Sequence, residues 1–272
     1  MTQVNNHAFL CRHFIQRIGR VVPINFVIVG APRTGSTLLV KTLNSLAGVC
    51  CHGELLGAKN VRGYEDGFDL VEASKGEREA RLQNLLLARD LDPIGFIQKA
   101  LAKDNTACGF KALYSAFLDP RWIIIRHWLL QAPEIRFIHL KRKNALRRFI
   151  SEQILLEGGP NHSGAGGKSE IPIKVHIDID TFQKRCVEIE AEHSALTAML
   201  LHQDVLHLNY EELSADTATT LGRVCEFLTL DRDPLNIEPA LQKVGSANLQ
   251  DSVSNFQELL DNNITRTMAL MD

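Results

Sequence analysis

The chain has 272 residues, of which 45% are hydrophobic, 23% charged and 6% aromatic. This composition is typical of a globular protein and excludes the collagenous, low-complexity and wholly disordered classes. The 30 basic and 32 acidic residues leave a net charge of −2. Nucleic-acid binders usually carry a basic excess, so we expect no nucleic-acid partner.

The same sequence predicts a cytoplasmic protein without a membrane span. Residues 21–32 form the longest uncharged stretch near the N-terminus, which is shorter than the ~20 apolar residues of a spanning helix. Residues 1–20 contain two histidines and two arginines before Arg20, so they do not resemble a signal peptide. The six cysteines lack metal-ligand spacing, which favours reduced thiols and no metal site.

The first predicted elements are a strand and a helix joined by a tight loop. Residues 26–29 are apolar and mostly β-branched, which predicts a buried strand ending at Gly30. Leucines then recur at helical spacing through residues 37–47. Gly48 follows this pattern and predicts the end of the helix.

Strand and helix patterns alternate along the rest of the chain. Capping signals at Ser74, Asp92 and Asp119 predict three helix starts. Short apolar runs predict strands at 108–113, 136–140 and 205–208. A helical pattern runs from the cap at Ser74 to Arg89, and others cover 144–156, 180–202 and 217–228. This alternation predicts an α/β fold, with a parallel sheet flanked by helices on both faces. We expect one domain over 1–272, with its core at about 22–260 and a glycine-rich mobile loop at about 158–172.

Residues 30–37 (GAPRTGST) resemble a nucleotide-binding loop with one change. Both glycines and the final hydroxyl of the pattern G-x-x-x-x-G-K-[ST] are present, but Ser36 replaces the lysine. Backbone N–H groups at such a strand-to-helix turn form an anion site. The hydroxyls of Thr34, Ser36 and Thr37 add donors, and Arg33 is the nearest cation. The alternative is a glycine-rich turn that binds nothing.

A second cationic segment follows the strand predicted at 136–140. Residues 136–148 contain six cations and no acid. Lys141, Arg142 and Lys143 stand at the carboxyl end of the strand, where open α/β sheets bind ligands. Ser151 lies about two helical turns farther on. This segment predicts a second phosphate site, and a solvated helix face is the alternative.

Together these motifs resemble the sulfotransferases that use 3′-phosphoadenosine 5′-phosphosulfate (PAPS). Residues 32–39 (PRTGSTLL) resemble their 5′-phosphosulfate loop, and residues 137–151 (FIHLKRKNALRRFIS) resemble their 3′-phosphate motif. Residues 109–113 (GFKAL) are similar to a strand of the bacterial trehalose and nodulation-factor branch, and residues 209–230 are similar to a segment near the domain end. The resemblance spans about residues 25–260 and implies a P-loop-type sheet.

The resemblance also implies an activity and a set of ligands. It implies in-line sulfuryl transfer from PAPS, leaving PAP, to a hydroxyl or amine of a carbohydrate or small-metabolite acceptor, and it requires no metal. The cofactor-binding residues it implies are Arg33, Thr34, Gly35, Ser36, Thr37, Leu38, Arg142, Lys143 and Ser151. In much of the superfamily an arginine stands eight residues before the serine, where this chain has Lys143. We favour Arg142 for its forked hydrogen bonds and keep Lys143 as the substitute.

Two residues are candidates for the general base. In the trehalose branch a glutamate in a comparable segment is the base, and Glu54 matches it best. His52 is the rival, because its unperturbed pKa is already near neutral. Arg33 and the loop amides would stabilise the leaving phosphate. Lys111 is a further candidate near the acceptor or the leaving group.

Two other functions fit the loop at residues 30–37, which we call the phosphate loop. A P-loop nucleotide kinase or hydrolase would need the missing lysine and a magnesium-binding aspartate at a strand end. A non-catalytic nucleotide- or anion-binding module would need only the fold. The sequence is also compatible with a homo-oligomer, for which a helix such as 69–90 offers an interface.

Overall fold

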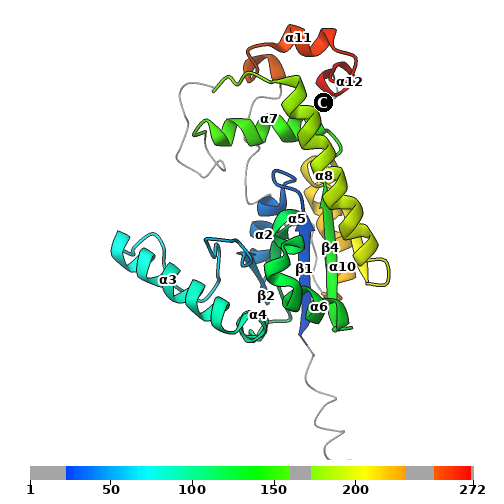
Figure 1. Ribbon diagram of the computed structural model, residues 1–272. Coiled ribbons are helices and arrows are strands. Elements are labelled where there is room, and N and C mark those ends of the chain that lie inside the picture. The colour runs from blue at the N-terminus through cyan, green and yellow to red at the C-terminus, as the bar shows by residue number, and fades with distance from the viewer. Residues whose placement is uncertain (1–22, 160–172, 231–247, 271–272) are drawn as a thin grey trace, which may run out of the picture.

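Five parallel strands form a single sheet in this computed structural model, which describes residues 23–159, 173–230 and 248–270. The strand order is β2-β3-β1-β4-β5. The strands are β1 (Ile24–Gly30), β2 (Val49–Glu54), β3 (Ala107–Leu113), β4 (Ile135–Lys141) and β5 (Val205–Asn209). The predicted parallel sheet with helices on both faces is therefore confirmed (Figure 1).

The apolar run of β1 places this strand at the centre of the sheet. Phe26, Val27, Ile28 and Val29 are all fully buried, as expected for a strand that is covered on both faces. Gly30 pairs with Leu113 of β3 and with Leu140 of β4, so the three strands end at the same edge. Chain segments that leave β1 and β4 there run to opposite halves of the sheet, which is where open α/β sheets form a ligand crevice.

Two buried clusters hold helices against the two faces of the sheet. One face is covered by α4 (Pro93–Leu101), α5 (Tyr114–Leu118), α6 (Ile123–Gln131) and α8 (Ile179–Met199). The opposite face is covered by α2 (Ser36–Asn44), α9 (Tyr210–Ala215) and α10 (Thr217–Phe227). Fully burying one leucine- or phenylalanine-sized side chain stabilises a fold by about 1.5–3 kcal/mol, so these clusters carry much of the fold's stability.

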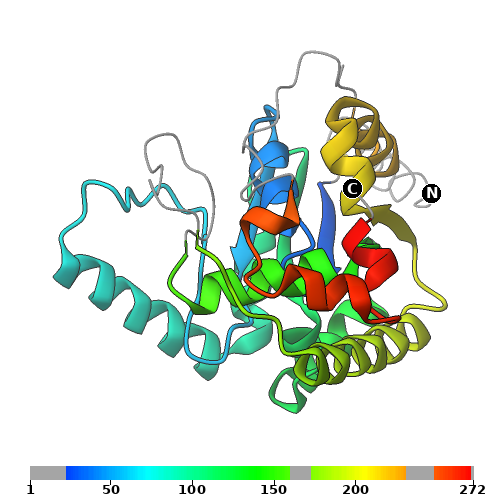
Figure 2. The same ribbon diagram turned by 90° about the horizontal axis from the view of Figure 1, so that it is seen from above.

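A third group of helices lies beyond the end of the sheet where β1 and β4 finish (Figures 1 and 2). These helices are α7 (Ala145–Leu156), α11 (Phe256–Asp261) and α12 (Arg266–Leu270), and their apolar side chains pack with the start of α8. Asn144 caps α7 by accepting a hydrogen bond from the Arg147 N–H at 2.9 Å. This arrangement places the first turns of α7 over the carboxyl edge of the sheet.

The capping signals mark helix starts as predicted, with one difference in helix type. Ser74 and Glu77 form a complete capping box at the start of α3 (Lys75–Leu91), and Asp92 caps α4. Asp119 instead caps a short 3-10 turn, η1 (Pro120–Trp122), which leads into α6. A second 3-10 turn, η3 (Leu249–Asp251), precedes α11. Helix α3 extends away from the sheet in both Figure 1 and Figure 2.

Helix α2 ends three residues before the predicted position. The Asn44 side chain accepts a hydrogen bond from the Cys51 N–H at 2.6 Å and donates to the Cys51 carbonyl at 2.8 Å. Strand β2 is at the edge of the sheet, so these bonds satisfy backbone groups that would otherwise lack a partner. Residues 160–172, most of the predicted mobile loop, lie outside the described residues. None of the helices formed by the described residues combines the length and apolar character that membrane crossing requires.

Candidate active site

The loop between β1 and α2 has the backbone of an anion-binding turn. Arg33 and Gly35 both adopt left-handed conformations, with φ of 64° and 82°. A Cβ atom at Gly35 would lie 2.4 Å from Cδ2 of Tyr210, so this position requires glycine on two grounds. Among the described residues, no side chain caps the N-terminus of α2, so its first N–H groups remain suited to an anion.

The loop hydroxyls have different surroundings. Thr34 is buried and donates to the Ala31 carbonyl at 2.9 Å, which tightens the turn. Ser36, in the position of the missing lysine, is buried at the first position of α2. Thr37 accepts a hydrogen bond from Lys111 Nζ at 3.0 Å. Leu38 is half-buried and packs against the apolar cluster on the α2 face. Of the three hydroxyls, that of Thr37 is therefore the one joined to another predicted site residue.

The two motifs predicted to bind phosphate lie side by side. Arg33 Nε donates to Ser151 Oγ at 3.0 Å, across 118 residues of chain. Arg142 donates from its NH1 group to the Arg33 carbonyl at 3.2 Å. The paired ends of β1 and β4 bring the loop and the cationic segment to one edge of the sheet.

Arg142 and Lys143 point to different surroundings. The Arg142 guanidinium stacks on the Tyr210 ring at 4.4 Å from its centroid, and its Nε is buried without a hydrogen-bond partner among the described residues. Burial lowers the pKa of Arg142, as it does for Arg33. Lys143 contacts Glu212 at 3.3 Å, and its side chain is 56% exposed. Only Arg142 therefore faces the phosphate loop.

A cavity of about 460 Å³ opens beside these residues at the ends of β1 and β4. Thr34 and Arg142 line it together with Lys141 and Arg148. Arg148 is buried, and its NH2 group has no partner among the described residues, although its NH1 group contacts Glu152 at 2.9 Å. An unpaired buried donor is costly, and Arg142 and Arg148, which both line this cavity, each retain one.

Glu54 is connected to the phosphate loop through Lys111. Lys111 Nζ lies 2.9 Å from Glu54 Oε1 and 3.0 Å from Thr37 Oγ1. The two charged residues are register partners on β2 and β3, and the register shifts between His52 and Glu54. Lys111 is 7% exposed, so its ammonium depends on these two oxygens for most of its solvation.

His52 is placed differently. Its Nδ1 accepts a hydrogen bond from the Glu65 N–H at 2.9 Å, and its Nε2 lies 2.9 Å from the Ala100 carbonyl. The ring is fully buried and stacks on Tyr64. Both nitrogens are therefore occupied by backbone groups, and neither is available to take a proton from an acceptor.

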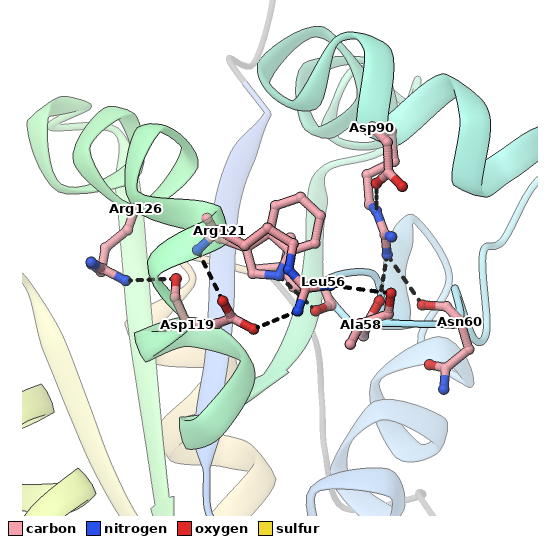
Figure 3. Close-up of polar contacts among 10 residues, drawn as sticks. Leu56, Ala58, Asn60, Asp90, Asp119, Arg121 and Arg126 are labelled. Carbon is pink, nitrogen blue, oxygen red and sulfur yellow. Dashed lines mark hydrogen bonds and ion pairs between the residues drawn. The ribbon is translucent and has the colours of Figure 1, made fainter.

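The segment that follows Glu54 is held by three side chains from two other elements, η1 and α3 (Figure 3). Trp122 Nε1 donates to the Leu56 carbonyl at 2.9 Å, and Arg121 donates to the Ala58 carbonyl at 3.3 Å. Arg89, fully buried at the end of α3, donates to the Asn60 carbonyl at 3.2 Å. These bonds fix the backbone immediately after the Glu54 carboxylate.

The sequence singled out neither Tyr210 nor Arg148 as an individual site residue, although both stand in segments that resemble the family's motifs. Tyr210 closes over Gly35 and stacks on Arg142. The position of Tyr210 directly after β5 indicates that it lies at the same carboxyl edge of the sheet as the phosphate loop. Nothing in the sequence distinguishes Arg148 from its neighbour Arg147, since the choice depends on which face of α7 is buried.

Comparisons with known proteins identify the family of this chain. The model of the sulfotransferase family matches residues 23–234, whereas no curated protein sequence matches. Among solved structures, the sulfotransferase domain from the curacin biosynthetic pathway has a TM-score of 0.52 and 18% identity, covering 91% of this chain and 89% of its own. This likeness supports the same fold.

Two further solved structures are less similar. A sulfotransferase from Alicyclobacillus acidocaldarius has a TM-score of 0.44 and 12% identity, covering 91% of this chain and 94% of its own. A mouse sulfotransferase complexed with PAP has a TM-score of 0.43 and 12% identity, covering 86% and 71%. Because the family model matches most of the chain, this protein belongs to the sulfotransferase family.

Proposed function

We propose that this protein transfers the sulfuryl group of PAPS to a hydroxyl or amine of a carbohydrate or small-metabolite acceptor. The observation that carries the proposal is the contact between Arg33 and Ser151 at 3.0 Å, with Arg142 bonded to the Arg33 carbonyl. A donor with phosphates at both ends needs two neighbouring anion sites, and these bonds join residues from both motifs.

The side chains at the sheet edge suit the two anionic ends of PAPS. The N–H groups at the start of α2 and the Arg33 guanidinium suit the 5′-phosphosulfate. The unpaired donors of Arg142 and Arg148, together with the Ser151 hydroxyl, suit the 3′-phosphate. Ser36 in place of the lysine is consistent with a donor that has no γ-phosphate.

Different residues would stabilise the leaving group, accept the acceptor's proton and orient the base. PAPS, when bound, supplies an activated sulfuryl group and a phosphate leaving group. Arg33 and the loop N–H groups would stabilise the negative charge that develops on the leaving oxygen. Glu54 would take the proton of the acceptor, and a general base is typically worth about 10²–10⁴-fold in rate. Lys111 would orient the Glu54 carboxylate relative to the loop through its contacts with Glu54 and Thr37.

Ligand-dependent thermal stability tests the donor. PAP or PAPS at about 100 times its dissociation constant should add ~2.7 kcal/mol to the free energy of unfolding. Stabilisation by Mg·ATP and not by PAP would indicate a nucleotide kinase or hydrolase instead. Release of PAP from PAPS with a panel of hydroxylated and amine acceptors then tests catalysis. Tight PAP binding without any release across the panel would indicate a binding module.

A pair of variants tests which cation reads the 3′-phosphate. Arg142→Ala should weaken PAP by about 10- to 100-fold, because a hydrogen bond to a charged group contributes about 1.5–3 kcal/mol. The same variant should lose far less affinity for adenosine 5′-phosphosulfate, because that ligand lacks the 3′-phosphate. Lys143→Ala is the matched control and should change neither affinity by more than about twofold, since its ion pair is exposed. Equal losses for both ligands in Arg142→Ala would remove this residue from the 3′-phosphate site.

A further inference from the structure

A buried pair of thiols lies between β2 and β3, apart from the residues assigned above. Cys50 and Cys108 are register partners on these neighbouring strands. Both side chains belong to the apolar cluster on the α4 face, whereas the adjacent Cys51 belongs to the cluster on the α2 face. Paired strands run about 4.8 Å apart, which lies within the Cα separation of about 4.4–6.8 Å that disulfides span.

His52 completes a group with these thiols but does not make it a metal site. The two sulfurs and His52 Nε2 all lie within 4.8 Å of one another. The Glu65 N–H can only donate, so His52 Nδ1 must accept that bond and the ring proton is assigned to Nε2. That proton points to the Ala100 carbonyl at 2.9 Å. Nε2 therefore has no lone pair for a metal, and the reactive groups are the two sulfurs.

The surroundings make the two sulfurs unequal. The neighbouring Cys108 thiol lowers the pKa of Cys50, opposed by burial and helped by His52, whose Nε2 lies 3.8 Å away. The neighbouring Cys50 sulfur, followed by burial, raises the pKa of Cys108, whose thiol donates to the Ala100 carbonyl at 3.3 Å. Cys50 is 9% exposed and Cys108 is fully buried. Cys50 is therefore the thiolate that reacts first with a small oxidant, and Cys108 is the neighbouring thiol that reacts second.

We propose that Cys50 and Cys108 are a modification site, at which a peroxide converts the two thiols into a disulfide that joins β2 to β3. The Cys50 thiolate attacks one peroxide oxygen, the O–O bond breaks, and the leaving hydroxide takes up a proton to become water. Cys108 sulfur then attacks the sulfenic sulfur of Cys50, the S–O bond breaks, and a second water leaves with the Cys108 proton. Two thiols and one hydrogen peroxide thus give one disulfide and two waters.

Peptide mapping of the full chain tests the site. The reduced protein is treated with hydrogen peroxide, denatured, alkylated and digested with trypsin, which releases residues 42–59 and 104–111 as separate peptides. We expect these two peptides to be joined, at the sum of their masses less two hydrogens, with one alkylated cysteine remaining in 42–59. Joined peptides with Cys50 alkylated, or both peptides fully alkylated while Cys186 is oxidised, would overturn the proposal.

Matched variants identify which thiols are joined. Cys51→Ala changes the neighbouring buried thiol on the opposite face and should leave the cross-link intact, whereas Cys50→Ala and Cys108→Ala should each abolish it. Loss of the cross-link in Cys51→Ala, with a native circular dichroism spectrum, would contradict the assignment. The wild-type map needs no substitution, so it decides the question even where a variant fails to fold. The readout is a covalent mass, so the result does not depend on the proposed transfer of sulfate.

Discussion

Replacing Gly35 with alanine should destabilise the protein by about 1.5–4 kcal/mol. The first contribution is the backbone, because a φ of 82° costs an alanine roughly 1–2 kcal/mol. The second is steric. The new Cβ would lie 2.4 Å from Tyr210 Cδ2, where ordinary contact is 3.4–4 Å. The ring must then move by about 1 Å, which weakens its cation–π contact with Arg142, itself worth about 0.5–2 kcal/mol.

Gly67→Ala is the matched control, because it keeps the backbone cost and removes the steric one. Gly67 has a φ of 83°, and nothing lies within 4 Å of the position of its Cβ. We expect a loss of about 1–2 kcal/mol there. The free energy of unfolding is measured by urea titration, with the slope checked for constancy. In a Tyr210→Ala background, Gly35→Ala should cost no more than Gly67→Ala does.

Equal losses for Gly35→Ala and Gly67→Ala in the wild-type background would refute this reasoning. They would mean that Tyr210 moves at no cost, and that its closure over the phosphate loop does not hold Arg142. A larger loss at Gly35 that persists after Tyr210 is truncated would place the cost elsewhere in the loop. The same variants can be assayed for PAP affinity, which should fall with Gly35→Ala alone.

Three further predictions concern the base, the pH response and α3. Glu54→Gln should keep PAP affinity and lose about 10²–10⁴-fold in turnover; unchanged turnover would remove Glu54 as the base. Burial, with smaller effects of His207 and His193, lowers the pKa of His139 to about 3. In the unfolded chain, His139 binds a proton below about pH 6.5, whereas in the folded protein it stays neutral down to about pH 3. The stability that the neutral ring contributes is therefore complete above pH 6.5 and is lost as the pH falls towards 3. Urea titrations at a series of pH values should show that this residue lowers the free energy of unfolding by ~1.4 kcal/mol at pH 5.5. The free energy of unfolding should depend less steeply on pH in His139→Gln, and the same pH dependence in both proteins would contradict the assignment. Ser74→Ala removes the capping box of α3 and should cost about 1 kcal/mol, seen as faster amide exchange in the first turn; exchange as slow as in the wild type would show that the cap is not needed.

Some elements of this protein are determined by residues that are close together in sequence. The apolar run of β1, the glycines of the loop and the leucines of α2 are local signals, because each reflects burial or backbone geometry within a few residues. The capping residues Ser74 and Asp92 act over three residues and mark helix starts correctly. The motif order predicts the family for the same reason, since each motif is a short segment with its own chemistry.

Strand β2 and the relation of Glu54 to His52 depend on tertiary contacts. The residues of β2 lack strand periodicity, and the sequence alone predicted no strand there. The strand exists because it pairs with β3 and because Asn44 binds its outer edge. A register shift between His52 and Glu54 separates their surroundings, so that backbone groups occupy the histidine while Lys111 binds the carboxylate.

The choice between Arg142 and Lys143 likewise depends on distant residues. Both are cations at the end of β4, and the sequence does not tell which of them turns towards the loop. Tyr210 supplies a ring for one and Glu212 a carboxylate for the other, from a helix that begins more than 60 residues later. Side-chain direction at a strand end depends on what packs against it. The local sequence therefore determines that the edge is cationic, and only the assembled sheet decides which cation faces the phosphate loop.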